Sequence, residues 1–189
     1  MKFILASKSP RRKEILEKFG YDFIIKDAVF NEISEHLSPV ITILKNSEGK
    51  AKSVFDALNC EEKKKFAVIG ADTVVFLDGK ILGKPATPEQ AEKDLKELSG
   101  KSHFVYTGYA VVYDGICVSG YDRTEVVFND LPDSVIKEYV ATGSPMDKAG
   151  SYGIQDGFDL VKRIDGSLYN VIGFPIEKLK PILDTLAAK

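Results

Sequence analysis

The chain opens with a short apolar strand that runs directly into a helix start, and this pairing constrains the fold more than any other feature. Residues 3–6 are apolar, and Ser9 and Pro10 follow as a helix N-cap and a proline at the first helical position. Ile15 begins an apolar helix face, and Gly20 suits the position just after the helix end. The pattern predicts a βα unit.

The rest of the chain alternates strands, hairpins and helices. Expected strands cover residues 23–25, 66–76, 80–82, 104–113 and 116–128, and expected helices cover residues 39–58, 88–100, 132–141 and a last stretch from about 175. Two further apolar stretches, 158–164 and 168–172, flank a turn, and Pro181 is expected to kink or interrupt the last helix. Hairpins mixed with crossovers predict an α/β fold on a long, curved, mixed sheet, and residues 1–189 are expected to form a single domain.

Two arginines follow the first helix start, where helices usually carry carboxylates. Arg11 and Arg12 lie in the first turn, at the positive end of the helix macrodipole. The arrangement becomes favourable if an anion docks there and collects backbone N–H groups, the hydroxyl of Ser7 and the guanidinium groups. This favours a phosphate-binding site over the alternative of an ordinary capped helix with solvated arginines.

Asp72 is a charged residue in a segment that is otherwise suited to a hydrophobic core. It lies in an otherwise apolar strand, where an unpaired carboxylate would be costly. We therefore expect Asp72 to face a metal ion, a cationic group or a solvent-filled cleft, with a structural ion pair as the alternative. The neighbouring Gly70 and Ala71 favour a functional role, because small residues let a ligand approach the backbone.

Two lysines are weaker candidates. Lys84 lies between Gly83 and Pro85, which restrict the loop and would present the ammonium group to a phosphate as a point charge. An ordinary surface lysine is the alternative. Lys50 lies on a predicted helix whose other face is apolar, and taken alone it is expected on the solvated face.

Residues 143–155 form a second dense segment. It combines three glycines with the charged pair Asp147 and Lys148, with Tyr152 and with Gln155. Permissive glycines beside charged groups are typical of a ligand-facing loop, and the amide of Gln155 can read the edge of a base. A long structural turn is the alternative.

The composition excludes several function classes. The net charge of −2 provides no basic field for nucleic acid or an anionic membrane, and no segment approaches the ~20 apolar residues of a membrane span. Cys60 and Cys117 lack metal-ligand spacing and a disulfide framework, which predicts a cytoplasmic protein. His36 and His103 stand apart from any recognisable nucleophile, so triad hydrolysis and zinc chemistry have no support.

Taken together, these segments resemble the Maf family of septum-formation-inhibitor-like nucleotide pyrophosphatases. The resemblance runs through nearly the whole chain in order, and its first and last runs are long and specific. The matching runs are Leu5-Ala-Ser-Lys-Ser-Pro-Arg-Arg12, Lys50-Ala51, Gly70-Ala-Asp-Thr73, Gly83-Lys-Pro85, Leu98-Ser-Gly100 with His103, Thr124-Glu-Val-Val-Phe128 and Asp147-Lys-Ala-Gly-Ser-Tyr-Gly-Ile-Gln155.

The resemblance implies an activity and a fold. Family members cleave a nucleoside triphosphate between the α- and β-phosphates and release pyrophosphate, with Mg²⁺ or Mn²⁺, or else Co²⁺, as cofactor. The implied fold resembles that of the inosine-triphosphate pyrophosphatases, with two lobes on a long curved sheet and a cleft between them. The implied partner is a small-molecule nucleotide. The sequence does not decide between a monomer and a homodimer.

The resemblance also assigns roles to residues. Asp72 would be the acid/base or metal-linked carboxylate that orients the attacking water. Apart from the resemblance, Glu32 or Glu35 is a candidate for a second metal carboxylate, because a carboxylate suits a divalent ion. Arg12, Thr73 and Gln155 match positions associated with base choice in the branch that acts on dTTP and UTP. The phosphate cradle would consist of Ser7, Arg11, Arg12, Lys50 and Lys84. Its two lysines would also be catalytic groups.

Three positions depart from the family pattern. Ser144 stands where an acidic residue often precedes the proline, Asp156 interrupts the usual Gln-Gly step, and Phe174 replaces a common leucine. The first two lie beside the base-reading loop that the resemblance implies. They bear on the base preference and do not touch the phosphate cradle.

The sequence leads to three functional hypotheses. The leading hypothesis is a metal-dependent pyrophosphatase that acts on dTTP and UTP or on modified pyrimidine nucleotides, with a role in nucleotide-pool sanitation or cell-division arrest. The alternative is a non-catalytic, nucleotide-binding regulator of septum formation, in which Asp72 is structural. A nucleic-acid-binding module is disfavoured by the negative net charge.

Overall fold

The computed structural model describes residues 1–33 and 38–188, so Glu35 and His36 lie outside the described residues. The chain divides into two compact units. Unit 1 comprises Met1–Asp72, Thr107–Asp122 and Gly173–Lys189, and unit 2 comprises Thr73–Tyr106 and Arg123–Ile172. Two units agree with the two lobes expected from the sequence.

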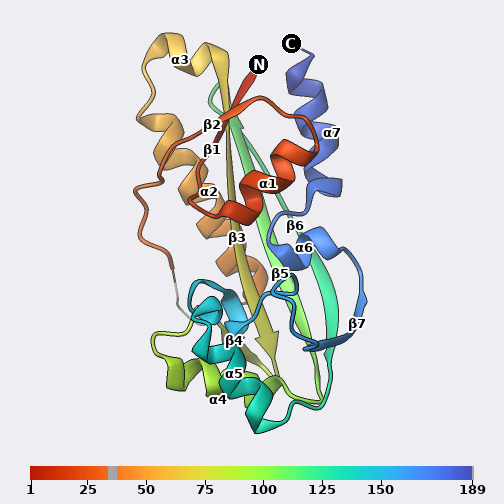
Figure 1. Cartoon of the computed structure of the whole chain (residues 1–189). Helices are drawn as coiled ribbons and strands as arrows, with labels where there is room; N and C mark the ends of the chain where they lie inside the picture. Colours follow the sequence, from red (N-terminus) through yellow and green to blue (C-terminus); the bar gives the residue numbers. More distant parts are fainter. Residues whose placement is uncertain (34–37, 189) are drawn as a thin grey trace. The chain divides into compact units, whose positions relative to one another are not determined.

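A seven-stranded sheet orders its strands β2-β1-β3-β5-β6-β7, with β4 also paired to β3 (Figure 1). Strand β1 pairs in parallel with β2 and β3, whereas β4 is antiparallel to β3 and β7 is antiparallel to β6. The mixed α/β class expected from the sequence is therefore confirmed. The strands are β1 Lys2–Leu5, β2 Phe23–Ile25, β3 Phe66–Leu77, β4 Lys80–Leu82, β5 Ser102–Tyr113, β6 Ile116–Phe128 and β7 Val161–Asp165.

Two Asp-Gly pairs make the tight hairpins that the sequence indicates. Asp78 and Gly79 have φ values of 48° and 82°, and Asp114 and Gly115 have φ values of 49° and 76°. Positive φ at both central residues is the type I′ geometry, whose twist matches that of the flanking strands. These turns join β3 to β4 and β5 to β6.

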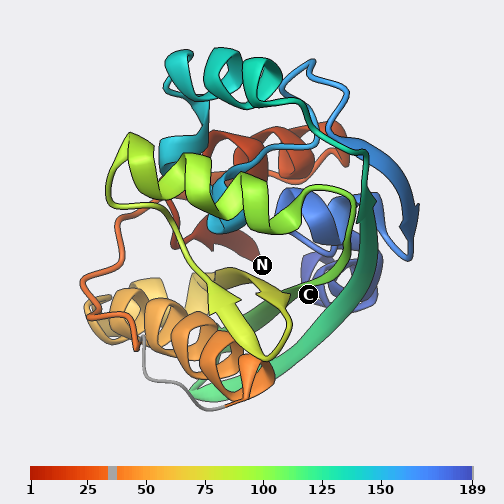
Figure 2. The same ribbon diagram turned by 90° about the horizontal axis from the view of Figure 1, so that it is seen from below.

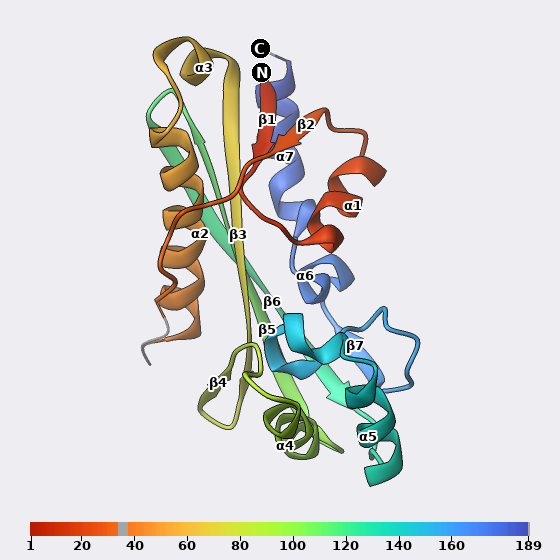
Figure 3. The same cartoon turned by 60° about the vertical axis from the view of Figure 1, so that its left-hand side comes forward.

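Unit 1 encloses the parallel strands between helices. Figure 3 shows α2 (Pro39–Asp56) on one side of β1 and β3, with α1 (Pro10–Lys18) and α7 (Ile176–Ala187) on the other. Strand β1 is accordingly buried on both faces. The core on the α2 side joins Ile4 and Val68 to Ala51, Val54 and Phe55 of the helix.

Unit 2 has a core of its own beneath two helices that lie side by side, α4 (Pro88–Leu98) and α5 (Asp133–Ala141) (Figure 2). Leu95 and Leu98 of α4 and Tyr139 of α5 pack with Val126 and Phe128 of β6. The remaining short elements of this unit are the 3-10 turns η1 (Ser144–Asp147) and η2 (Ala149–Ser151) and helix α6 (Leu168–Ile172).

Three local features were not predicted in full. Helix α3 (Cys60–Lys65) was not expected, and it begins at a capping box in which Asn59 and Glu62 exchange hydrogen bonds. Residues 168–172, expected only as an apolar stretch after a turn, form helix α6. Pro181 does not interrupt helix α7, because the apolar side of the helix, which includes Leu179 and Leu183, stays buried. No helix of residues 1–33 and 38–188 is long and apolar enough to cross a membrane.

Helix α2 and strand β3 approach each other very closely at Gly70. A Cβ atom at Gly70 would lie 2.3 Å from the carbonyl oxygen of Ser47 and 2.9 Å from the amide nitrogen of Ala51. The expectation that Gly70 and Ala71 make room for a ligand is therefore wrong for Gly70. The missing side chain makes room for the backbone of α2 instead.

We expect Gly70→Ala to lower the free energy of unfolding by about 1–3 kcal/mol, because overpacking in a well-packed interior forces the backbone to shift. Urea denaturation measures the change. Gly83→Ala is the matched control, since no described atom beyond residues 82–84 lies within 4 Å of a Cβ at Gly83. Equal stabilities of the two variants would contradict the close approach of α2 to β3.

Candidate functional site

The ammonium group of Lys50 lies between two carboxylates in unit 1. Its Nζ atom is 2.7 Å from Asp72 Oδ1 and 2.7 Å from Glu32 Oε1. The side chains of Lys50 and Asp72 are only 12% and 10% exposed, whereas that of Glu32 is 54% exposed. The expectation that Lys50 lies on the solvated face of its helix is wrong, because that part of α2 faces Asp72 on β3.

Asn46 completes the environment of Asp72, and sequence reasoning missed it. Its Nδ2 atom donates to Asp72 Oδ2 at 2.9 Å. Its amide also pairs with the backbone of Ile33, accepting from the N–H at 2.8 Å and donating to the C=O at 3.2 Å. Asn46 lies four residues before Lys50 and therefore on the same side of α2, which is the signal that could have revealed it.

Arg12 connects the first helix to two other parts of unit 1. Its Nε atom donates to the carbonyl of Gly173 at 2.9 Å, and one terminal nitrogen donates to Ser7 Oγ at 3.0 Å and to the carbonyl of Ala71 at 2.9 Å. The hydrogen bond to Ala71 places Arg12 beside the residue that precedes Asp72. Backbone carbonyls therefore hold the guanidinium group in place.

The start of α1 is organised by Ser7 rather than by the side chain of Ser9. Ser9 occupies the N-cap position with extended backbone, and Pro10 begins the helix as expected, but the Ser9 side chain makes no capping bond. The Ser7 hydroxyl instead accepts a hydrogen bond from the Ser9 amide at 3.2 Å. Ser7 thus contacts both the helix start and Arg12.

The charges of this region act on one another. Burial lowers the pKa of Arg12, and the positive charge of Arg11 lowers it further. The carboxylates of Asp72 and Glu32 act in the opposite direction. The arginine nevertheless stays charged, because its reference pKa is so high. Three cations, Arg11, Arg12 and Lys50, therefore share a neighbourhood with two carboxylates in unit 1.

The donor atoms of this neighbourhood suit a hard divalent cation. The described residues contain no group of three or more His, Cys, Asp or Glu side chains able to hold a metal ion. Mg²⁺, however, commonly binds through one or two carboxylates plus substrate phosphates and water. Asp72 and Glu32 provide two carboxylates, which Lys50 bridges here, and their oxygen donors fit a metal ion that binds together with a phosphate ligand.

The other predicted residues belong to unit 2. Thr73 follows Asp72 on β3 and is half-buried, whereas Lys84 and Gln155 are exposed. The loop around Lys84 is held within this unit, because the carbonyl of Gly83 accepts a hydrogen bond from the amide of Gly150 at 2.9 Å. The loop expected from Gly83 and Pro85 is thus an ordered one.

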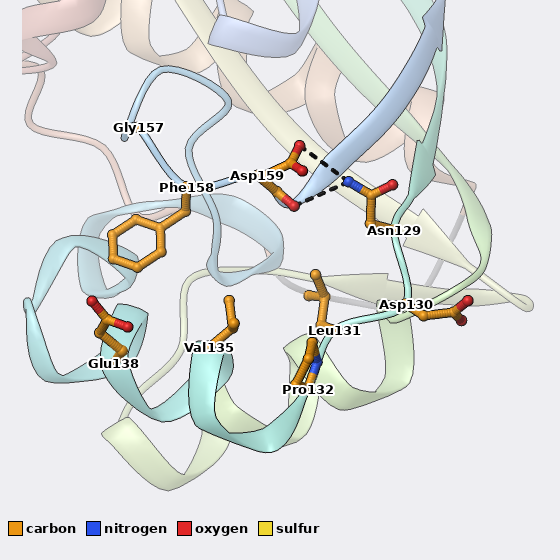
Figure 4. Close-up of a pocket in the computed structure, with 9 residues that line it drawn as sticks. All are labelled: Asn129, Asp130, Leu131, Pro132, Val135, Glu138, Gly157, Phe158 and Asp159. Atoms are coloured by element: carbon orange, nitrogen blue, oxygen red, sulfur yellow. Dashed lines mark hydrogen bonds between the residues drawn. The ribbon is translucent and has the colours of Figure 1, made fainter.

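A hollow of about 700 Å³ in unit 2 contains none of the predicted residues (Figure 4). Its lining carries the carboxylates of Asp130, Glu138 and Asp159 and no cationic side chain, which makes it unsuited to a phosphate. Asn129 donates from Nδ2 to the carbonyl of Asp159 at 3.0 Å and to its carboxylate at 3.1 Å, which ties two lining segments together. The lining residues are Asn129, Asp130, Leu131, Pro132, Val135, Glu138, Gly157, Phe158 and Asp159.

His103 is a buried structural residue of unit 2. Its Nε2 atom is 2.7 Å from the hydroxyl of Tyr152, and its ring packs against Phe128 and Tyr152. Nδ1 is buried without a hydrogen-bond partner among the described residues. Burial lowers the pKa of His103 to about 4, so the neutral ring is the native form.

The family model for Maf-like proteins matches residues 2–186, and the chain therefore belongs to the Maf family. A protein of Thermococcus onnurineus named dTTP/UTP pyrophosphatase is 46% identical over 175 residues, which cover 92% of each chain. Proteins with the same name from Thermococcus kodakarensis and Caldicellulosiruptor bescii are 46% and 43% identical. They cover 95% and 98% of this chain and 95% and 94% of their own.

A solved structure, the Ham1 protein of Staphylococcus aureus, aligns with a TM-score of 0.42 at 15% identity. The alignment covers 69% of this chain and 73% of that one.

We expect His103 to make the protein less stable in mild acid. Below pH 6.5 the unfolded chain binds a proton at this ring, whereas the folded chain does so only near pH 4, so stability falls as the pH falls through this window. At pH 5 the loss amounts to about 2 kcal/mol. Urea denaturation at pH 7.5 and pH 5 should show a smaller loss for His103→Gln than for the wild type. Equal losses would contradict the prediction.

Proposed function

We propose that this protein hydrolyses dTTP and UTP to the nucleoside monophosphate and pyrophosphate with a divalent metal ion. The observation that carries the proposal is the position of Lys50 between Asp72 and Glu32, beside Arg12 and the start of α1. Hydrolysis of a phosphoanhydride needs charge neutralisation and an aligned water molecule, and this neighbourhood has groups for both. The names of the relatives support the choice of substrates.

The cations of unit 1 would bind the phosphates. Arg11 and Arg12 lie at the N-terminal end of α1, where backbone N–H groups and the helix dipole also favour an anion. Lys50 is already held by carboxylates, so its ammonium group is positioned before substrate arrives. Such preorganised charge costs little reorganisation during the reaction.

Asp72 would orient the attacking water and accept its proton. As the oxygen of that water bonds to the α-phosphorus, the bond from this phosphorus to the α–β bridging oxygen breaks, and pyrophosphate leaves. Asp72 is held by Lys50 and Asn46, which fix the direction of its two oxygens. No covalent intermediate is required.

Asp72 and Glu32 would hold the metal ion together with phosphate oxygens. When bound, the ion neutralises charge that develops on the phosphates. Co²⁺ is the alternative to Mg²⁺ and Mn²⁺.

The remaining assignments are predictions. We assign Lys84 to the phosphates, and Arg12, Thr73 and Gln155 to base choice, on the strength of the family resemblance. We also expect residues 1–189 to act as one catalytic domain in the cytoplasm, with roles in nucleotide-pool sanitation or cell-division arrest.

One observation favours the alternative function. Both oxygens of Asp72 accept hydrogen bonds from side chains, as they would in a purely structural ion pair. A nucleotide-binding regulator without turnover would look the same at this position. Saturable dTTP binding without release of pyrophosphate by the wild-type protein would identify that function.

We expect Asp72→Asn to reduce pyrophosphate release from dTTP by about 10²- to 10⁴-fold, the usual contribution of a positioned base. The neutral amide cannot take the proton from water, although it fills the same space. A coupled pyrophosphate assay with Mg²⁺ or Mn²⁺ measures the rate, and urea denaturation shows whether the variant is folded.

Asp184→Asn is the matched control in the same unit. The Asp184 carboxylate pairs with Lys180 and Tyr21 and is half-exposed, so turnover should stay close to that of the wild type. Full activity of Asp72→Asn, or orthophosphate as the first product of the wild type, would overturn the proposal.

A further inference from the structure

Two of the departures from the family pattern, twelve residues apart in sequence, contact each other. The hydroxyl of Ser144 donates to Asp156 Oδ2 at 2.8 Å. The same carboxylate oxygen accepts a hydrogen bond from the hydroxyl of Tyr139 at 2.5 Å. Burial raises the pKa of the Tyr139 phenol, and the hydrogen bond to Asp156 raises it further. The hydroxyl therefore stays protonated and remains a hydrogen-bond donor. The two unusual residues thus form one polar cluster within unit 2.

A buried ammonium group lies at the centre of this cluster. Lys148 Nζ donates to the carbonyl of Ser144 at 2.6 Å and to its hydroxyl at 3.0 Å, and it is 2.8 Å from Asp147 Oδ1 and 3.4 Å from Asp156 Oδ2. The Lys148 side chain is 9% exposed and that of Asp156 is 16% exposed, whereas Asp147 is 58% exposed. A buried charge needs a desolvated partner, and Asp156 is the more buried of the two carboxylates.

The cluster holds both ends of the turn that carries Gln155. Within the turn, the amide of Asp156 donates to the carbonyl of Gly153 at 3.2 Å. The amide of Gly153 donates to the hydroxyl of Tyr139 at 2.9 Å, so the first end of the turn is bound to the same tyrosine as the last. Gln155 lies between these ends and is exposed.

The side chains of the ion pair close over the start of the turn. A Cβ atom at Gly153 would lie 2.6 Å from Lys148 Cε and 2.6 Å from Asp156 Oδ1. No side chain fits at Gly153 while Lys148 and Asp156 keep these positions. Packing and hydrogen bonding therefore restrict the same turn.

The segment beyond the turn is anchored separately. Figure 4 shows the side chain of Asn129 directed at Asp159, to which it donates hydrogen bonds. The backbone N–H of Asn129 donates to the carbonyl of Leu160 at 2.9 Å. These contacts hold the chain after Gly157 but do not reach Gln155. The ion pair and Tyr139 therefore hold the turn on which Gln155 lies.

We propose that Asp156 and Lys148 are positioning residues that hold the 153–156 turn so that the amide of Gln155 meets the pyrimidine base. Asp156 acts through the turn and does not touch the substrate. This inference rests on the proposed hydrolysis of dTTP and UTP. Ser144 is the donor that keeps the carboxylate of Asp156 directed at Lys148 and Tyr139.

The first test is Asp156→Gly, which removes the carboxylate from the turn. We expect the KM for dTTP to rise by about tenfold with kcat changed by less than about twofold, because a base contact equal in ground and transition states is lost. The ratio of kcat/KM for UTP over ATP should fall by a similar factor. Asp133→Asn is the control in the same unit: it removes an exposed carboxylate that pairs with Lys96 outside this cluster, and both values should stay within about twofold of the wild type.

The second test is the exchange Asp156→Gly with Ser144→Asp, which keeps the net charge of the wild type. The Ser144 hydroxyl is 3.0 Å from Lys148 Nζ, so a carboxylate at this position can also pair with the ammonium group. A positioning role predicts that KM and the UTP preference return to within about threefold of the wild type. A direct contact between Asp156 and substrate predicts no rescue and would overturn the proposal.

Hydrogen exchange provides a readout that does not depend on turnover. Protection of the Gly153 amide should fall in Asp156→Gly and return in the double variant. Unchanged protection in Asp156→Gly would overturn the inference even in an active enzyme. Failure of the wild type to release pyrophosphate would instead overturn the proposed function, and the two failures are therefore distinguishable.

Discussion

The close approach of helix α2 to strand β3 is the constraint on which the rest of unit 1 depends. The backbone of the helix at Ser47 occupies the space beside Gly70 that any side chain would need. That proximity brings Asn46 and Lys50 to the two oxygens of Asp72, two residues further along the strand. A carboxylate in an apolar strand would otherwise be strongly destabilising, so the packing of the helix and the presence of the charge require each other.

The same logic recurs in unit 2 with the signs of the charges exchanged. Here a buried lysine, Lys148, needs carboxylates, and they come from its sequence neighbour Asp147 and from Asp156 on a turn. Because the second carboxylate lies on the turn, satisfying the buried charge also orders the backbone around Gln155. Charge burial thus couples stability to the presentation of an exposed side chain, Gln155, to which we assign base choice.

Much of the fold could be predicted from local patterns. Apolar alternation, Asp-Gly turns and proline at helix starts act over a few residues, and the predicted strands and helices agree with the structure at nearly all of these places. The failures are also instructive. Residues 168–172 carry an apolar pattern too short to separate strand from helix, and Pro181 is tolerated because burial of the α7 face outweighs one lost hydrogen bond.

The sequence by itself determined the order of the elements, the start of α1 and the identities of the charged residues, since these follow from short-range preferences and residue chemistry. The tertiary structure alone decided which charges meet. Lys50, expected in solvent when taken alone, is buried against a carboxylate twenty-two residues away. Asn46, whose signal is its place four residues before Lys50 on α2, meets the other oxygen of that carboxylate. Ser144 and Asp156, two separate irregularities in the sequence, became one cluster. The partner of a buried charge depends on which distant segments pack together, and no local pattern contains that information.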